Sequence, residues 1–355
     1  MTLPRPVETA PPGALRDRLV ALPKAELHLH ALGALRPSTV VELARAKNAR
    51  ILADAERGAA QGYRFQDLPR FVEFFIGLFE LVVTPADFER VTYELLEDAA
   101  RLGIRYVEPR WSPTSQTSRG ATLDGMWAGL EAGRRTAERR YGIVARWIVD
   151  FPRSLPVSVA EEALAGAVRT MDRHTVGFDI SGDERAVAAS EAFAPVFRRA
   201  RAAGLRCVAH AGEAAGPESV TGALDLYGAE RIGHGTRAIE DPALVARLAA
   251  SRVPLEVCPT SNVRLNVVAS VAEHPIRRFL AAGVPVVISA DDPALFGTDL
   301  VAEYEVLHRE AGLSFEALAA CAARSFEFAL IEPGEARDRL EDARRTAAAL
   351  AGASS

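Results

Sequence analysis

The chain has 355 residues, of which 49% are hydrophobic and 25% are charged, a balance typical of a globular protein. Its formal net charge of −5 argues against a nucleic-acid-binding surface. The three cysteines are widely spaced and form no CxxC pair, so we expect a cytoplasmic protein without disulfides. No apolar run reaches the length of a signal peptide or a membrane-spanning helix, so we expect no membrane partner.

Short apolar runs alternate along the chain with longer segments of helical periodicity. We predict eight strands, at Lys24–His30, Ile104–Pro109, Ile143–Phe151, Thr175–Ser181, Leu205–Ala211, Arg231–Gly235, Pro254–Pro259 and Pro285–Asp291. Helical patterns lie between them, at Ala86–Arg101, Gly125–Arg140, Val159–Met171, Arg185–Ala203, Ser219–Leu226, Ala243–Ala250 and Ile276–Ala282.

This order predicts an α/β fold, a (β/α)8 TIM barrel in one domain over residues 1–355. A doubly wound open sheet is the alternative, but the segment after the first strand lacks a glycine-rich phosphate turn. Pro37–Thr84 is too long for one connection and carries an aromatic helix, which is either plain core or a lid over the top of the barrel. The tail Phe315–Ser355 is predicted to be helical, with fraying of its last residues.

Polar side chains suited to a metal site follow four of the predicted strands. They are His28 with His30, His210 with Glu213, His234, and Asp291 with Asp292. His28 and His30 share one face of their strand, because side chains alternate along a strand. Barrel enzymes place their chemistry at the carboxyl ends of the strands, so we expect these groups to meet there. Imidazoles, a carboxylate ligand and a second carboxylate for proton transfer are what a hydrolytic metal site needs.

Each of these groups also has a purely structural interpretation. Glu213 can be an acid at the amino end of a helix, where negative charge is favoured. Asp291 and Asp292 can likewise begin a helix, but two adjacent acids at a buried strand end repel each other unless a cation lies near. The remaining candidates are interpreted as non-functional: a buried apolar role for Cys207, and surface or capping roles for His174, His274 and His308.

The same segments resemble the signature motifs of the adenosine deaminase family. The matching stretches are Lys-Ala-Glu-Leu-His28-Leu-His30, Ser181-Gly182-Asp-Glu, Ala-His210-Ala-Gly-Glu213, Arg-Ile-Gly-His234-Gly, Cys-Pro-Thr-Ser-Asn262 and Ala-Asp291-Asp292-Pro. The resemblance implies a (β/α)8 barrel with one Zn²⁺ ion per chain, held by His28, His30, His210 and Asp291. Iron and manganese are alternatives to zinc.

The resemblance also implies roles for Glu213, Gly182, His234 and Asp292. Glu213 would serve purine N1, the backbone N–H of Gly182 would donate to N3, and Asp292 would contact N7. His234 and Asp292 would orient the attacking hydroxide and take its proton. Zinc lowers the pKa of bound water toward ~7, so hydroxide attacks C6 of the aminopurine and ammonia leaves. A neutral Glu213, with its pKa raised by burial, would protonate N1 and make the ring electrophilic.

One position departs from the family pattern. Adenosine deaminases carry Asp two residues after the second strand-one histidine, where it binds the ribose 5′-hydroxyl, and adenine deaminases carry Glu. This chain has Leu32, which cannot make that hydrogen bond. The chain also resembles aminodeoxyfutalosine deaminases of menaquinone biosynthesis, through Tyr63–Phe71, Arg146–Pro152 and Phe296–Leu300 followed by Glu303 and Tyr304.

Their substrate, 6-amino-6-deoxyfutalosine, carries an aryl ketone chain in place of the 5′-hydroxyl. An apolar Leu32 and an aromatic lid that includes Phe71 suit such a chain. Arg119, or alternatively Arg64, is the candidate for binding the benzoate end. The expected partner is therefore a small-molecule aminopurine nucleoside, and a homo-oligomer remains open.

Three other functions are weighed against this one. The first is an adenosine, adenine or other 5′-modified adenosine deaminase of purine salvage. The second is a hydrolase of amides or phosphoesters, although phosphoester hydrolysis usually uses two metals ~4 Å apart, and the chain supplies ligands for one. The third is a catalytically silent purine-binding barrel, which would be expected to lack a ligand or an acid, and none is missing here.

Overall fold

The computed structural model describes residues 12–65, 68–185, 187 and 189–352. A parallel sheet lies at its centre, with the strand order β1-β2-β4-β5-β6-β7-β8-β9. The strands are β1 (Lys24–His30), β2 (Ile104–Trp111), β4 (Trp147–Pro152), β5 (Thr175–Ser181), β6 (Arg206–Ala211), β7 (Arg231–His234), β8 (Leu255–Val257) and β9 (Val286–Ile288). A short strand, β3 (Val144–Ala145), pairs with β2 beside this path.

The first and last strands of this series meet through backbone hydrogen bonds. The N–H of Asp291 donates to the carbonyl of His28 at 3.0 Å, and the N–H of His30 donates to the carbonyl of Asp291 at 2.9 Å. The eight parallel strands therefore form a nearly closed barrel, which confirms the predicted (β/α)8 fold. The third predicted strand divides into β3 and β4, because Arg146 pairs with β2 through Val107 whereas Trp147 pairs with His174 on the other side.

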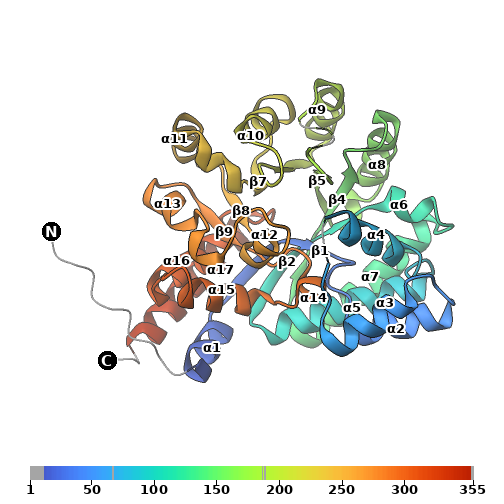
Figure 1. Ribbon diagram of the computed structural model, residues 1–355, viewed down its shortest axis with the longest axis horizontal. Coiled ribbons are helices and arrows are strands. Elements are labelled where there is room, and N and C mark those ends of the chain that lie inside the picture. The colour runs from blue at the N-terminus through green and yellow to red at the C-terminus, as the bar shows by residue number, and fades with distance from the viewer. Residues whose placement is uncertain (1–11, 66–67, 186, 188, 353–355) are drawn as a thin grey trace.

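Helices surround the strands (Figure 1). Those of the outer layer are α5 (Pro85–Arg101), α7 (Leu123–Tyr141), α8 (Val157–Arg169), α9 (Ala194–Ala202), α10 (Pro217–Gly222), α11 (Pro242–Ser251), α13 (Ile276–Ala281) and α16 (Phe315–Glu327). Shorter or additional helices are α1 (Pro12–Ala21), α6 (Pro113–Thr117), α12 (Pro259–Arg264), α14 (Pro293–Phe296), α15 (Leu300–Arg309) and α17 (Pro333–Gly352). Single turns of other helix types are η1 (Met171–Arg173), η2 (Glu191–Phe193), η3 (Ala223–Tyr227), η4 (Thr236–Glu240) and η5 (Val271–Glu273).

Helix α9 differs from its prediction. It begins at Ala194 and not at Arg185, because Pro195 lies in its first turn and cannot continue a helix from upstream residues. Helix α5 was predicted correctly, and a capping box marks where it begins. Thr84 accepts a hydrogen bond from the N–H of Asp87, whose carboxylate accepts in return from the N–H of Thr84.

The insert after β1 forms α2 (Pro37–Ala46), α3 (Leu52–Gln61) and α4 (Leu68–Phe79). Helix α4 lies nearer to the centre of the ring than α2 and α3 (Figure 1). The ring of Phe71 stacks on Phe296 at 5.2 Å between centroids, and the ring of Phe75 meets His30 edge-on at 6.2 Å. The aromatic helix is thus both part of the hydrophobic core and in contact with a predicted metal ligand, as a lid requires.

Of the three histidines expected at surface or capping positions, none is exposed, and His274 makes a capping contact, since its Nδ1 accepts the N–H of Ile276 in the first turn of α13. His274 and His308 are buried, and the ring of His308 contacts the carbonyl of Leu313 at 2.7 Å. His174 is half-buried and ends the turn η1 in a left-handed conformation. Cys207 is fully buried, as predicted. The prediction of fraying after residue 352 lies outside the described residues, and among those described no helix is long and apolar enough to cross a membrane.

Candidate active site

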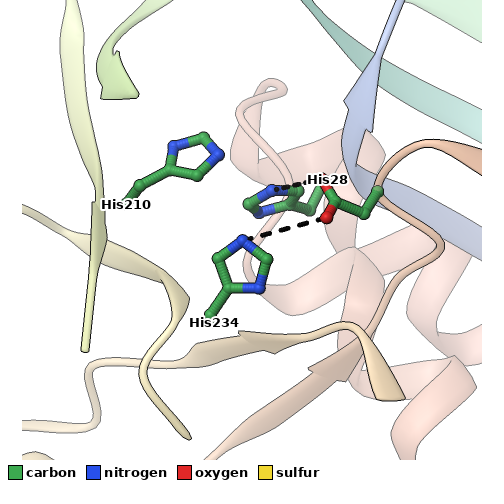
Figure 2. A group of neighbouring side chains, drawn as sticks. His28, His210 and His234 are labelled. Carbon is green, nitrogen blue, oxygen red and sulfur yellow. Dashed lines mark ion pairs between the residues drawn. The ribbon is translucent and has the colours of Figure 1, made fainter. Parts of the chain in front are cut away.

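The predicted polar groups converge at the carboxyl ends of the strands. His28 and His30 come from β1, His210 from β6 and His234 from the end of β7, while Asp291 follows β9. The ring of His28 lies 4.6 Å from that of His210 and 4.7 Å from that of His234, centroid to centroid. Figure 2 shows the rings of His28, His210 and His234 gathered at one place, each on a separate strand.

Among the four predicted metal ligands, His28, His210 and Asp291 fall with His234 in one group whose ligand atoms all lie within 4.8 Å of one another, and His30 falls with Asp291 and Asp292 in a second. His30 Nε2 lies 3.1 Å from His210 Nε2, and Asp291 Oδ1 lies 3.3 Å from His28 Nε2 and 3.4 Å from His30 Nε2. Zinc bonds of about 2.0–2.2 Å in tetrahedral geometry place ligand atoms about 3.3–3.5 Å apart. Two imidazole nitrogens this close repel each other when both carry lone pairs, and either a shared proton or a bound cation relieves that repulsion. These residues therefore fit one divalent metal ion.

Buried carboxylates orient two of these histidines. Glu256 Oε2 lies 2.9 Å from His28 Nδ1, and Asp179 Oδ2 lies 3.1 Å from His210 Nδ1. A carboxylate at Nδ1 favours the proton there and leaves the lone pair of Nε2 free to bind metal. His28 Nε2 has no hydrogen-bond partner among the residues that the structure describes. Burial and the charge of Arg110 lower the pKa of His28 to about 4, which keeps it in the neutral form that metals bind.

Arg110 joins the two carboxylates beneath the histidines. Its guanidinium donates to Asp179 at 2.6 Å, to Glu256 at 2.5 Å and to the carbonyl of Leu27 at 2.8 Å. Burial alone would raise the pKa of both carboxyl groups. The nearby cations, Arg110 for Glu256 and His210 with Arg110 for Asp179, hold both below the ordinary value. Sequence reasoning missed this layer, although charged residues inside apolar strands are a usable signal.

The two adjacent acids have opposite electrostatic environments. Asp291 accepts a 2.6 Å hydrogen bond from the Ser261 hydroxyl, and its pKa lies well below the ordinary value because the histidines around it outweigh burial. Burial, and then the charge of Asp291, hold the pKa of Asp292 well above the ordinary value. Gly33 makes room for Asp292, since a Cβ at residue 33 would lie 1.8 Å from Asp292 Oδ1.

Glu213 and His234 face each other at the same end of the barrel. Glu213 Oε1 lies 3.7 Å from His234 Nε2. Burial raises the pKa of Glu213, which favours a neutral carboxyl group that can donate a proton. His234 and Asp291 both have positive φ, at 61° and 63°. Such angles are costly for residues other than glycine, and they cluster at functional sites.

A second buried carboxylate holds the turn that carries Glu213. Glu184 accepts hydrogen bonds from four consecutive backbone N–H groups, at 2.8 Å from residue 212, 2.7 Å from 213, 2.8 Å from 214 and 3.3 Å from 215. The Ser219 hydroxyl donates to the same carboxylate. The buried guanidinium of Arg153 lies 4.0 Å away and outweighs burial to lower the pKa of Glu184. The carboxylate of Glu184 therefore holds in place the turn that carries Glu213.

The predicted substrate contacts lie around this centre. Gly182 follows β5 with a φ of 92° and is exposed, and Leu32 is buried two residues beyond His30. Arg119 is half-buried, with its guanidinium 5.5 Å from the centroid of the Phe79 ring. The Phe79 ring lies 5.6 Å from that of Phe75, which in turn meets His30. Arg119 is thus connected to the predicted metal ligand His30 through the rings of Phe79 and Phe75.

Comparison with known proteins adds to this geometry. Residues 23–344 match the family model described as adenosine deaminase. An aminodeoxyfutalosine deaminase of Streptomyces coelicolor is 42% identical over 96% of this chain and 88% of its own length. An adenine deaminase of the same organism is 39% identical over 90% of this chain and 93% of its own.

Solved structures agree with the fold. The adenine deaminase of Arthrobacter aurescens aligns with a TM-score of 0.86 and 33% identity, over 91% of this chain and 98% of that one. A Burkholderia ambifaria amidohydrolase with bound zinc aligns with a TM-score of 0.89 and 28% identity, over 97% of both chains. With the family model matching most of its length, the chain belongs to the adenosine deaminase family and is a deaminase, a hydrolase that acts on carbon–nitrogen bonds.

Proposed function

We propose that this protein is a zinc-dependent deaminase of a 6-aminopurine nucleoside, with 6-amino-6-deoxyfutalosine of menaquinone biosynthesis as its substrate. The observation that carries the metal-dependent reaction is the cluster of three imidazole nitrogens and one carboxylate oxygen at 3.1–3.4 Å. A similar solved amidohydrolase holds zinc, which supports that metal over iron or manganese. The identity to aminodeoxyfutalosine deaminases supports the substrate.

The residues of this chain supply binding and proton transfer. When bound, the metal would lower the pKa of a water toward about 7 and so provide a nucleophile at neutral pH. Glu213, with its raised pKa, holds a proton for purine N1, whose protonation makes C6 electrophilic. The N–H of Gly182 is proposed to donate to N3. Asp292, whose pKa is also raised, is proposed to contact N7 and to take the proton of the water, which His234 would help to orient.

The 5′ side of the pocket carries the substrate assignment. Leu32 is buried and apolar, so it offers no acceptor for a ribose 5′-hydroxyl. Phe71, stacked on Phe296, would cover an aryl chain, and Arg119 would bind its carboxylate beyond Phe79. This part of the proposal is separate from the reaction at C6, and the two can fail independently.

A substrate panel tests the proposal. Purified protein is assayed by the change in purine absorbance with adenosine, adenine, methylthioadenosine and aminodeoxyfutalosine. We expect kcat/KM to be at least about tenfold higher for aminodeoxyfutalosine than for adenosine, since a buried polar contact discriminates by about that factor or more. Equal or faster turnover of adenosine or adenine would overturn the substrate and leave the aminopurine deaminase. No turnover of any member would overturn both.

Leu32→Asp tests the 5′ side directly. The new carboxylate would accept a hydrogen bond from a 5′-hydroxyl and would place a charge beside an aryl chain. One such bond is worth ~1.5–3 kcal/mol, so the ratio of kcat/KM for adenosine to that for aminodeoxyfutalosine should rise about tenfold to hundredfold. Leu32→Ala is the control, because it removes apolar contact without adding an acceptor. An unchanged ratio in Leu32→Asp would remove Leu32 from the specificity determinants.

Single ligand replacements test the metal set. His28→Ala and His210→Ala should each lose both metal and activity, as measured by elemental analysis against a wild-type content of one zinc per chain. His174→Ala is the matched control, because that ring is half-buried and lies at the end of η1. Full metal content in either ligand variant would exclude that residue from the ligands.

A further inference from the structure

Behind His234 lies a chain of hydrogen bonds that ends at a backbone amide. The N–H of Ile276 donates to His274 Nδ1 at 3.2 Å, and His274 Nε2 lies 3.2 Å from Asn262 Oδ1. Asn262 Nδ2 in turn lies 3.2 Å from His234 Nδ1. All three side chains are buried. Sequence reasoning gave a catalytic role to His234 alone, placed Asn262 in a family motif without a role and expected His274 at a surface or capping position.

The donor and the acceptor in each of these hydrogen bonds follow from the last member of the series, the N–H of Ile276. A backbone amide can only donate, so His274 Nδ1 must accept and His274 must carry its proton on Nε2. Burial lowers the pKa of His274 to about 4, which keeps this ring neutral. The Nε2–H of His274 then donates to Asn262 Oδ1, and the hydroxyl of Thr236 donates to the same oxygen at 2.9 Å. The Asn262 amide is thereby oriented with its NH₂ group toward His234.

Asn262 favours one tautomer of His234, and the metal-site carboxylates favour the opposite tautomer of His28 and His210. Glu256 and Asp179 can only accept, so they favour a proton on Nδ1 of His28 and His210 and a lone pair on Nε2. The Asn262 NH₂ group can only donate, so it requires a lone pair on Nδ1 of His234. The proton of a neutral His234 is then on Nε2, which faces Glu213 Oε1 at 3.7 Å and Asp291 Oδ2 at 4.0 Å, both acceptors.

We propose that Asn262 and His274 are positioning residues that hold His234 in its Nε2–H tautomer, so that His234 donates a hydrogen bond into the active site. This refinement rests on the proposed function for its catalytic meaning. His234 would orient the attacking oxygen by donating to it, and would neither bind the metal nor take a proton at Nε2. One group of possible metal ligands contains His28, His210 and His234. Their Nδ1 partners separate the two proposed ligands, which face carboxylates, from the proposed donor His234, which faces the Asn262 amide.

The tautomer can be read without substrate. Full-length protein labelled with ¹⁵N-histidine contains seven histidines, and long-range ¹H–¹⁵N correlation spectra distinguish a protonated from an unprotonated ring nitrogen. The His234 signals are assigned by their loss in His234→Gln. We expect a protonated Nε2 and an unprotonated Nδ1 in both zinc-loaded and zinc-free protein. A proton on Nδ1 of His234 in the wild type would overturn the proposal, whatever the variants do.

Asn262→Asp exchanges the donor that faces His234 Nδ1 for an acceptor. The new carboxylate accepts where the amide donated, so the proton of His234 should move to Nδ1 in the same spectra. We expect kcat on the best substrate of the panel to fall at least about tenfold, as on loss of a preorganised donor, while KM changes less than about twofold and zinc content stays at one per chain. Asn266→Asp is the control, since it makes the same chemical change at an exposed residue and should keep the wild-type tautomer.

The outcomes separate the two proposals. A reversed tautomer with unchanged kcat would overturn the positioning role, and so would an unreversed tautomer in a folded Asn262→Asp protein. If that variant does not fold, the wild-type spectrum still decides. A protein with the Nε2–H tautomer that turns over no purine would overturn the proposed function through the substrate panel, and with it the catalytic meaning of the tautomer.

Discussion

At the scale of single residues, the environment of Glu213 decides what its carboxyl group can do. Burial raises its pKa, and the facing His234 opposes this shift. Glu213→Gln keeps the shape but has no acidic proton for purine N1. We expect zinc content to stay unchanged and kcat to fall by ~10²–10⁴-fold, the usual contribution of general acid–base catalysis.

The exposed Glu218, five residues further along the chain, provides the control for that replacement. Glu218→Gln makes the same chemical change outside the cluster of imidazoles and should leave kcat within about twofold of wild type. A Glu213→Gln enzyme that keeps more than about a tenth of wild-type turnover would show that another group protonates the ring.

At the scale of elements, the turn that carries Glu213 depends on Glu184 from the preceding strand-end loop. Glu184→Gln places an NH₂ group against backbone donors that previously met a carboxylate oxygen. We expect unfolding in urea to become easier by ~2–4 kcal/mol, since hydrogen bonds to a charged group contribute ~1.5–3 kcal/mol each and are only partly lost. Amide hydrogen exchange at residues 212–215 should become faster and kcat should fall.

Asp183→Asn is the matched control, because Asp183 is the adjacent acid and pairs with Arg185 on the half-exposed side of the loop. It should change neither exchange at residues 212–215 nor stability by more than about 0.5 kcal/mol. Equal effects of the two replacements would mean that loop charge in general, and not the contact of Glu184 with the turn, sets the position of Glu213.

At the scale of the whole molecule, three of the four predicted metal ligands come from the two ends of the barrel series, β1 and the segment after β9. His28 and His30 lie on the first strand, and Asp291 follows the last and pairs with the first through its backbone. A bound metal would therefore stabilise the closed ring, by ~4 kcal/mol when the free metal exceeds its Kd about a thousandfold. We expect chelation to lower Tm by several degrees in calorimetry and to abolish activity, and added zinc to restore both.

His28→Ala supplies the reference for that experiment. Because it lacks a ligand, its Tm should respond little to chelator or to zinc. A wild-type Tm that is insensitive to chelation would show that metal does not contribute to closure of the barrel. A His28→Ala protein that responds as strongly as the wild type would place the stabilising metal elsewhere in the chain.

The sequence by itself was enough for the barrel and for the convergent motifs. Alternating apolar strands and helical periods are local properties, and the rule that barrel chemistry lies at strand ends then brings together His28, His210, His234 and Asp291. Two details of the elements were not predicted, the first for a local reason and the second for a tertiary one. The expected start of α9 missed the effect of Pro195, and β3 and β4 divide where the pairing partner changes.

Tertiary structure alone decided which residues surround these motifs. His28 meets Glu256 across 228 residues of chain, and Arg110 meets the same carboxylate across 146. His274, expected at the surface or as a capping residue, is buried beside Asn262, which comes from the preceding helix α12. Periodicity predicts which side of an element faces inward, but the partner of a buried charge is set by the register between distant strands. That register exists only once the barrel has closed.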